Sequence, residues 1–235
     1  MSETYFRQWL SGRDFATDNA LAREMRNFTY ALGDPDAHEA VLVDPAYDPA
    51  SLFQLLARDD MTLVGVIATH YHADHIGGTL LGHPVAGIRE LMEIREVPVH
   101  VNVGDESWVN VGTGVTSPPV VPHADGDVVT VGSLELRLRH TPGHTAGSQC
   151  VEVAGRLLTG DTLFLDGCGR TDLPGSDPSE MYRSLQIRLA DLDDDLLVYP
   201  GHFYSPETSA TLRAVRARNQ VLAERSAEEW LRVFA

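Results

Sequence analysis

The stretch ATHYHADHIGG, residues 68–78, places three histidines and one aspartate within six positions: His70, His72, Asp74 and His75. Crowding three imidazoles together without a cation costs solvation free energy, so this segment predicts a metal site. In an extended segment, side chains two residues apart point the same way, so His70 and His72 can meet on one ion. Asp74 and His75 are adjacent and diverge, which suits a second ion. The two glycines that end the stretch allow the backbone to turn away sharply.

Three further segments place a polar residue directly after an apolar run and a glycine-containing turn. His144 lies in TPGHTAGS, Asp161 in LLTGDT and His202 in VYPGH. Each alone could be an ordinary loop residue, but the repetition favours ligands held at one edge of a rigid scaffold. We interpret the remaining histidines as surface or loop residues outside the site: His38, His83, His100, His123 and His140.

The pattern of apolar residues and turns predicts two sheets flanked by helices rather than one doubly wound parallel sheet. Strands are expected at 27–34, 39–45, 61–70, 97–102 and 196–201, with a run of short antiparallel strands between 128 and 160. Residues 115–127 are expected as a loop. Helices are expected at 48–60, 88–96, 177–192 and 206–225, with short ones near 106 and at 226–235. No linker or repeat divides residues 1–235, so we expect one domain.

Composition excludes several function classes. Of the 235 residues, 43% are hydrophobic, and 34 acidic residues against 18 basic ones give a formal charge of −16. This balance argues against nucleic acid or an anionic membrane as the partner. There are two cysteines, and neither an export signal nor a 20-residue apolar stretch is visible, so we expect a cytoplasmic protein.

Taken together, THYHADH, TPGHTAGS, TGD and PGH resemble the metallo-β-lactamase superfamily, from about residue 25 to about residue 205. The resemblance implies an α/β fold, a four-layer αββα sandwich, with two divalent metal ions (zinc, or iron or manganese) at one edge. It implies that His70, His72 and His144 hold one ion. Asp74, His75 and His202 would hold the other, and Asp161 would bridge the two.

Residues 160–182 resemble two subgroups, the glyoxalase II-like hydrolases and the persulfide dioxygenases. Within them, GCGRTD leans toward the dioxygenases, whereas GRTDLPGSD also resembles short glyoxalase II-like proteins. Because 33 residues follow His202, a glutathione-binding helical domain would be truncated to a short extension at 206–235. Residues 79–120 are longer than in the dioxygenases, and we expect a lid or an extra wall there.

The leading hypothesis is hydrolysis of a small thioester or ester by a metal-bridging hydroxide, with Asp74 as a ligand that also orients the hydroxide. Arg170 and Tyr204 are candidate contacts to the substrate, although Arg170 could equally pair with Asp172. Asp44 could orient a ligand imidazole or simply stabilise a turn, and Cys168 is interpreted as a bystander.

Two alternatives stay open. One ferrous ion held by His70, His144 and Asp161 would form the two-histidine, one-carboxylate site of a persulfide dioxygenase. A metal-binding protein without catalytic activity is the third reading. In each enzymatic case the expected partner is a small thioester or thiol-derived molecule, and the assembly to test is a homodimer.

Overall fold

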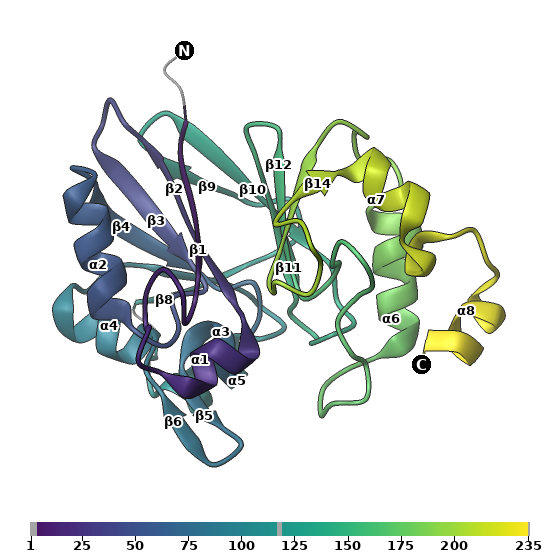
Figure 1. Ribbon diagram of the computed structural model, residues 1–235, viewed down its shortest axis with the longest axis horizontal. Coiled ribbons are helices and arrows are strands. Elements are labelled where there is room, and N and C mark those ends of the chain that lie inside the picture. The colour runs from purple at the N-terminus through teal and green to yellow at the C-terminus, as the bar shows by residue number, and fades with distance from the viewer. Residues whose placement is uncertain (1–3, 117–118, 235) are drawn as a thin grey trace.

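The computed structural model describes residues 4–116 and 119–234 and contains two six-stranded sheets and one small hairpin (Figure 1). The first sheet has the order β1-β2-β3-β4-β7-β8: Tyr5–Leu10, Phe28–Asp34, Glu39–Val43, Thr62–Ile67, Val99–Asn102 and Val120–His123. The second has the order β14-β13-β12-β11-β10-β9: Ala210–Thr211, Leu197–Pro200, Arg156–Gly160, Gln149–Val153, Leu134–His140 and Val128–Val131. The hairpin pairs β5 with β6, Gly78–Leu80 with His83–Val85.

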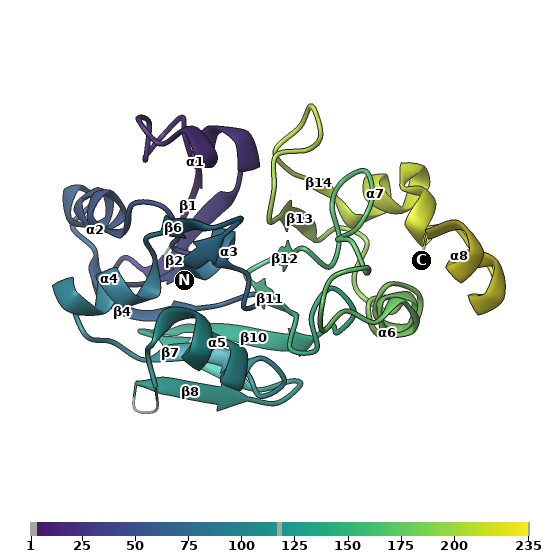
Figure 2. The same ribbon diagram turned by 90° about the horizontal axis from the view of Figure 1, so that it is seen from below.

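Helices cover the outer face of each sheet. Those of the first half are α1 (Ala20–Met25), α2 (Pro49–Arg58), α3 (Ala73–Ile76), α4 (Ile88–Ile94) and α5 (Glu106–Thr113). Those of the second half are α6 (Pro178–Arg183), which continues as a π-helical turn at Ser184–Arg188, then α7 (Leu212–Arg218), a 3-10 turn (Gln220–Leu222) and α8 (Ala227–Phe234). Figures 1 and 2 show α2 and α4 on one side of the molecule and α6, α7 and α8 on the other, with the sheets between them.

Three separate hydrophobic cores define the four layers. The middle core lies between the sheets and joins residues such as Leu32 of β2 and Leu138 of β10. One outer core packs α2 and α4 on the first sheet, and the other packs α6, α7 and α8 on the second around Trp230. Because β2 is covered on both faces, all seven of its residues are buried. The αββα sandwich expected from the sequence is therefore confirmed.

Most of the predicted elements are present, with four corrections. The helix expected at 206–225 is wrong, because Ala210–Thr211 pair with β13 and short helices at 212–218 and 220–222 follow. The expected loop at 115–127 contains β8, which pairs with β7 at the sheet edge. The strand expected at 61–70 ends at Ile67, three residues before His70. Strand β1 and helix α1 were not anticipated.

Two other expectations need comment. His100 and His123 are not surface residues: both are partly buried, and His100 Nδ1 lies 2.9 Å from His123 Nε2 across the β7–β8 pair. Residues 79–120 were expected to form a lid or an extra wall, but they include β7, which is a strand of the first sheet. A lid role for the rest stays a prediction. Within the described part of the chain, no helix is long and apolar enough to cross a bilayer.

Candidate metal centre

All seven predicted ligands lie in segments that follow a strand. His70 follows β4, and the single turn α3 begins after His72 and carries Asp74 and His75. The other three follow strands of the second sheet: His144 after β10, Asp161 after β12 and His202 after β13. Strand ends of both sheets therefore meet at one edge of the sandwich. Each of the seven predicted ligands contacts at least one of the others within this edge.

The turn of α3 is short because two glycines end it. Gly77 and Gly78 both have positive φ angles, 88° and 125°, which residues other than glycine rarely adopt. A Cβ on Gly77 would also lie 2.7 Å from the backbone of Gly87. The segment that carries Asp74 and His75 is thus a helical turn rather than the extended chain expected from the sequence, and the His75 ring packs against that of His70, with centroids 4.1 Å apart.

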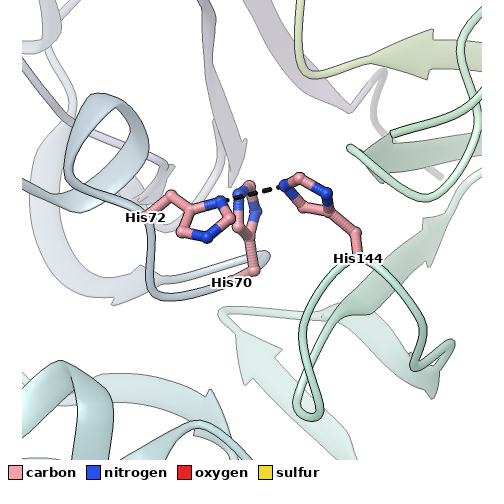
Figure 3. A group of neighbouring side chains, drawn as sticks. All are labelled: His70, His72 and His144. Carbon is pink, nitrogen blue, oxygen red and sulfur yellow. Dashed lines mark hydrogen bonds between the residues drawn. The ribbon is translucent and has the colours of Figure 1, made fainter. Parts of the chain in front are cut away.

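His70, His72 and His144 form the first trio (Figure 3). Their ligand atoms lie within 4.8 Å of one another, and His72 Nδ1 is 2.9 Å from His144 Nε2. Among the described residues, the buried His70 Nε2 has no hydrogen-bond partner, and neither has Asp161 Oδ1. A buried polar atom without a hydrogen-bond partner costs folding free energy, and the lone pairs of an imidazole nitrogen or a carboxylate oxygen can bind a cation instead.

Asp74, His75 and His202 form the second trio. The three distances among Asp74 Oδ2, His75 Nε2 and His202 Nε2 are 3.5, 3.4 and 3.3 Å. Two atoms bound to one zinc ion at about 2.0–2.1 Å in tetrahedral geometry lie roughly 3.3–3.4 Å apart, so the spacing fits an ion.

Asp161 lies between the two trios. Its Oδ1 is 3.4 Å from His75 Nε2, while its Oδ2 is 3.3 Å from His202 Nε2 and 3.6 Å from His144 Nε2. This is the position expected of a carboxylate shared by two ions. The structure brings the seven residues together as predicted, and their roles as ligands stay a prediction.

Further contacts fix which nitrogen of three of the imidazoles faces the site. His75 Nδ1 lies 2.8 Å from Asp44 Oδ2, His202 Nδ1 lies 2.8 Å from the Met25 carbonyl, and His144 Nδ1 lies 2.8 Å from the Arg170 carbonyl. Because these oxygens accept, the Nδ1 atoms donate and the Nε2 atoms face inward. The orienting role expected for Asp44 is thus supported by its geometry.

The charges of the site oppose the effect of burial. Burial alone would raise the pKa of Asp74 and of Asp161, but the surrounding histidines hold both pKa values well below their usual range. Burial, helped by neighbouring imidazoles, lowers the pKa of His70, and lowers that of His72 to about 4. The carboxylates are therefore ionised and these two imidazoles neutral at pH 7, which is the state that binds metal.

Two buried residues of this region were missed by the sequence analysis. Asn27, directly before β2, donates through Nδ2 to Asp74 Oδ2 at 3.0 Å. Asp105, directly before α5, accepts from Tyr71 N at 3.1 Å and from Thr145 Oγ1 and Gly147 N at 2.7 Å each. Asp105 therefore joins the loop of His70 and His72 to the loop of His144.

The two predicted substrate contacts lie near the site with different surroundings. The Arg170 guanidinium is exposed and forms two 2.7 Å hydrogen bonds with Asp172, the pairing weighed as its alternative. The Tyr204 ring is 52% exposed and stacks on His202, with centroids 4.6 Å apart. Burial raises the pKa of Cys168 to about 12, which agrees with a thiol that stays protonated and unreactive.

Comparison with known proteins agrees with the geometry. The profile described as Metallo-beta-lactamase superfamily matches residues 25–202. The human mitochondrial persulfide dioxygenase ETHE1 is 32% identical over 97% of this chain and 85% of its own length. A hydroxyacylglutathione hydrolase of Anaeromyxobacter dehalogenans is 36% identical over 86% of this chain and 71% of its own. The crystal structure of ETHE1 from Myxococcus xanthus is 33% identical, has a TM-score of 0.79 and covers 98% of this chain and 89% of its own.

Proposed function

The chain belongs to the metallo-beta-lactamase superfamily, and we propose that it is a metal-dependent hydrolase of a small thioester or ester. The observation that carries the proposal is the intact double site, in which Asp161 lies between two complete trios. A mononuclear enzyme with one ion on His70, His144 and Asp161 would not need the second trio. Relatives with similar sequence identity to this chain include both hydrolases and dioxygenases, so the choice between the two reactions rests on the geometry of the site rather than on sequence similarity.

Two divalent ions, zinc or else iron or manganese, would generate a hydroxide from a bound water at neutral pH and polarise the carbonyl of the substrate. The protein's part is to hold the ligands and to orient the reactants. The low pKa of Asp74 keeps this carboxylate ionised, so it can accept a hydrogen bond from the attacking water as well as ligate. The oxygens of Asp44, Met25 and Arg170 keep the imidazoles turned so that Nε2 faces inward.

Aromatic rings border the proposed substrate position. Tyr71 stacks on Trp108, with centroids 5.1 Å apart, and also contacts His72. Trp108 and Tyr204 are half exposed, so together with Tyr71 they offer apolar surface to an acyl or thiol group. Arg170 would bind a substrate carboxylate after releasing Asp172. The proposed substrate is a small molecule, and a homodimer and a cytoplasmic location stay predictions.

Persulfide dioxygenation is the second candidate, with one ferrous ion on His70, His144 and Asp161. Two observations favour it. Five buried side-chain atoms among the described residues have no hydrogen-bond partner, and the two that belong to predicted ligands, His70 Nε2 and Asp161 Oδ1, are both in that set. The human dioxygenase also matches more of this chain than the hydrolase from Anaeromyxobacter does, 97% against 86%.

The variant Asp74→Ala separates the two reactions, because Asp74 belongs only to the second trio. We would measure metal content by elemental mass spectrometry, then thioester hydrolysis and oxygen uptake with a persulfide. The hydrolase reading expects two ions per chain, thioester turnover and loss of turnover of about 100-fold or more in Asp74→Ala. One iron per chain and oxygen uptake that survives in the variant would replace it with the dioxygenase.

A further inference from the structure

Asn27 occupies an unusual position among the ligands of the second trio. It is 2% exposed, and its Nδ2 lies 3.0 Å from Asp74 Oδ2, 3.2 Å from His75 Nε2 and 3.4 Å from His202 Nε2. These are the three atoms that face the second ion. One carboxamide group is thus within hydrogen-bond distance of the whole trio.

The backbone holds Asn27 firmly in this place. It forms a bridge with His202, in which the Phe28 amide donates to the Gly201 carbonyl and the Phe203 amide donates to the Arg26 carbonyl, at 2.8 and 2.9 Å. The bridge therefore fixes the main chain of Asn27 beside that of His202, so both side chains start from adjacent backbone positions.

The count of donors and acceptors shows what this carboxamide needs. In the state that binds metal, both imidazoles donate through Nδ1 and present Nε2 as an acceptor, and the Asp74 carboxylate accepts as well. An NH₂ group has two hydrogens and here faces three acceptors. A cation satisfies all three, but it would repel the NH₂ group beside it, whereas an amide oxygen would bind it.

Tyr47 allows the carboxamide to turn. Its hydroxyl lies 2.9 Å from Asn27 Oδ1 and donates to it. A hydroxyl can also accept, so a rotation by 180° that exchanges oxygen and nitrogen keeps this hydrogen bond, with Nδ2 now donating to Tyr47. Tyr47 itself is buried and fixed by the hydrogen bond of its amide to the Ala86 carbonyl, at 2.7 Å.

We propose that Asn27 is a ligand of the second metal ion, which it binds through Oδ1. Before the ion binds, its NH₂ group donates within the trio and keeps the three side chains at ion-binding spacing. The first trio is different: His70 Nε2 has no hydrogen-bond partner among the described residues. The first ion therefore keeps an open position for the substrate, while the second has one more protein ligand. This inference depends on the proposed function only in that the two trios bind ions.

The test is the affinity of metal-free protein for Zn²⁺, measured for each of the two ions by competition with a chelator. Asn27→Ala is expected to weaken the second ion about 10–100-fold and to leave the first unchanged. Asn27→Asp, which keeps oxygen but lacks the NH₂ group, is expected to bind the second ion at least as tightly as the unaltered protein. Tyr47→Phe, which retains the ring, should weaken the second ion by a smaller factor.

Asn102→Ala is a matched control, because Asn102 is equally buried at 2% exposure and its side chain accepts from Gly104 N. It should leave the affinity for the second ion unchanged. The proposal is overturned if Asn27→Ala leaves the second ion unchanged or tightens it. It is also overturned if Asn27→Asp weakens binding as Ala does, or if the unaltered protein never takes up a second ion. Since the readout is affinity, a protein inactive on thioesters would refute the proposed function and leave this result standing.

Discussion

Replacing Asp44 with asparagine should weaken metal binding although Asp44 is not one of the seven predicted ligands. Its Oδ2 lies 2.8 Å from His75 Nδ1 and accepts from Thr69 Oγ1 at 2.6 Å, while its Oδ1 accepts from Thr69 N at 2.8 Å. Asparagine has nearly the same shape, but it can retain the acceptor on one side only. If Oδ1 still accepts from the Thr69 amide, the new NH₂ group meets two donors.

The easiest relief is for His75 to move its proton from Nδ1 to Nε2. That proton then lies where the lone pair should face the ion, so the second trio loses a ligand unless the proton moves back. Removing such an orienting partner typically costs 10–100-fold in metal affinity, which is about 1.4–2.7 kcal/mol. We therefore expect a loss in that range for the second ion.

The assay is chelator competition at pH 7 together with thermal unfolding of the metal-free protein. Asp34→Asn is the matched control, because Asp34 is also a buried aspartate of the first sheet and accepts from Ser133 and Asp36 outside the site. It should lower the melting temperature and leave metal affinity unchanged. The reasoning fails if Asp44→Asn binds the second ion normally, or if both variants lose affinity equally.

Three more variants test other parts of the structure. Asp105→Ala leaves two buried donors, Thr145 Oγ1 and Gly147 N, and the partly buried Tyr71 N without their acceptor, which should cost about 1–3 kcal/mol for each buried donor. The variant should also weaken binding of the first ion at least tenfold because it frees the His144 loop, and unchanged affinity in the chelator assay would contradict this. Trp230→Ala empties the outer core of the second sheet and should cost about 3–5 kcal/mol in urea unfolding, with metal affinity retained. Burial, with the neighbouring His123, lowers the pKa of His100 from 6.5 to about 4, so its contribution to stability is complete above pH 6.5 and is lost as the pH falls toward 4. His100→Gln should therefore lose less melting temperature between pH 7 and pH 4.5 than the unaltered protein, and an equal loss would show that His100 is not responsible.

Patterns within one segment predicted well, and pairings between distant segments did not. The spacing of His70, His72, Asp74 and His75 is local, so it indicated a metal site without any knowledge of the fold. The two residues of β14, Ala210 and Thr211, gave no strand signal, because they become a strand only by pairing with Leu197 and Val198 of β13. The long helix expected at 206–225 failed for the same reason: the sequence has helical spacing there, and an edge pairing overrides it.

Asn27, Asp44 and His70 show how topology could have supplied the missing residue. Strands β2 and β3 run antiparallel with Tyr30 opposite Val43, and β3 and β4 run parallel with Val43 opposite Ile67. The start of β2, the end of β3 and the end of β4 therefore lie at the same edge of the sheet. Asn27 lies directly before β2 and Asp44 directly after β3, so a polar residue beside an apolar strand carries meaning only when the direction of that strand is known. Because β2 runs opposite to β3 and β4, the residue of β2 that lies at this edge is the one before the strand, whereas the ligands predicted from the sequence all follow strands.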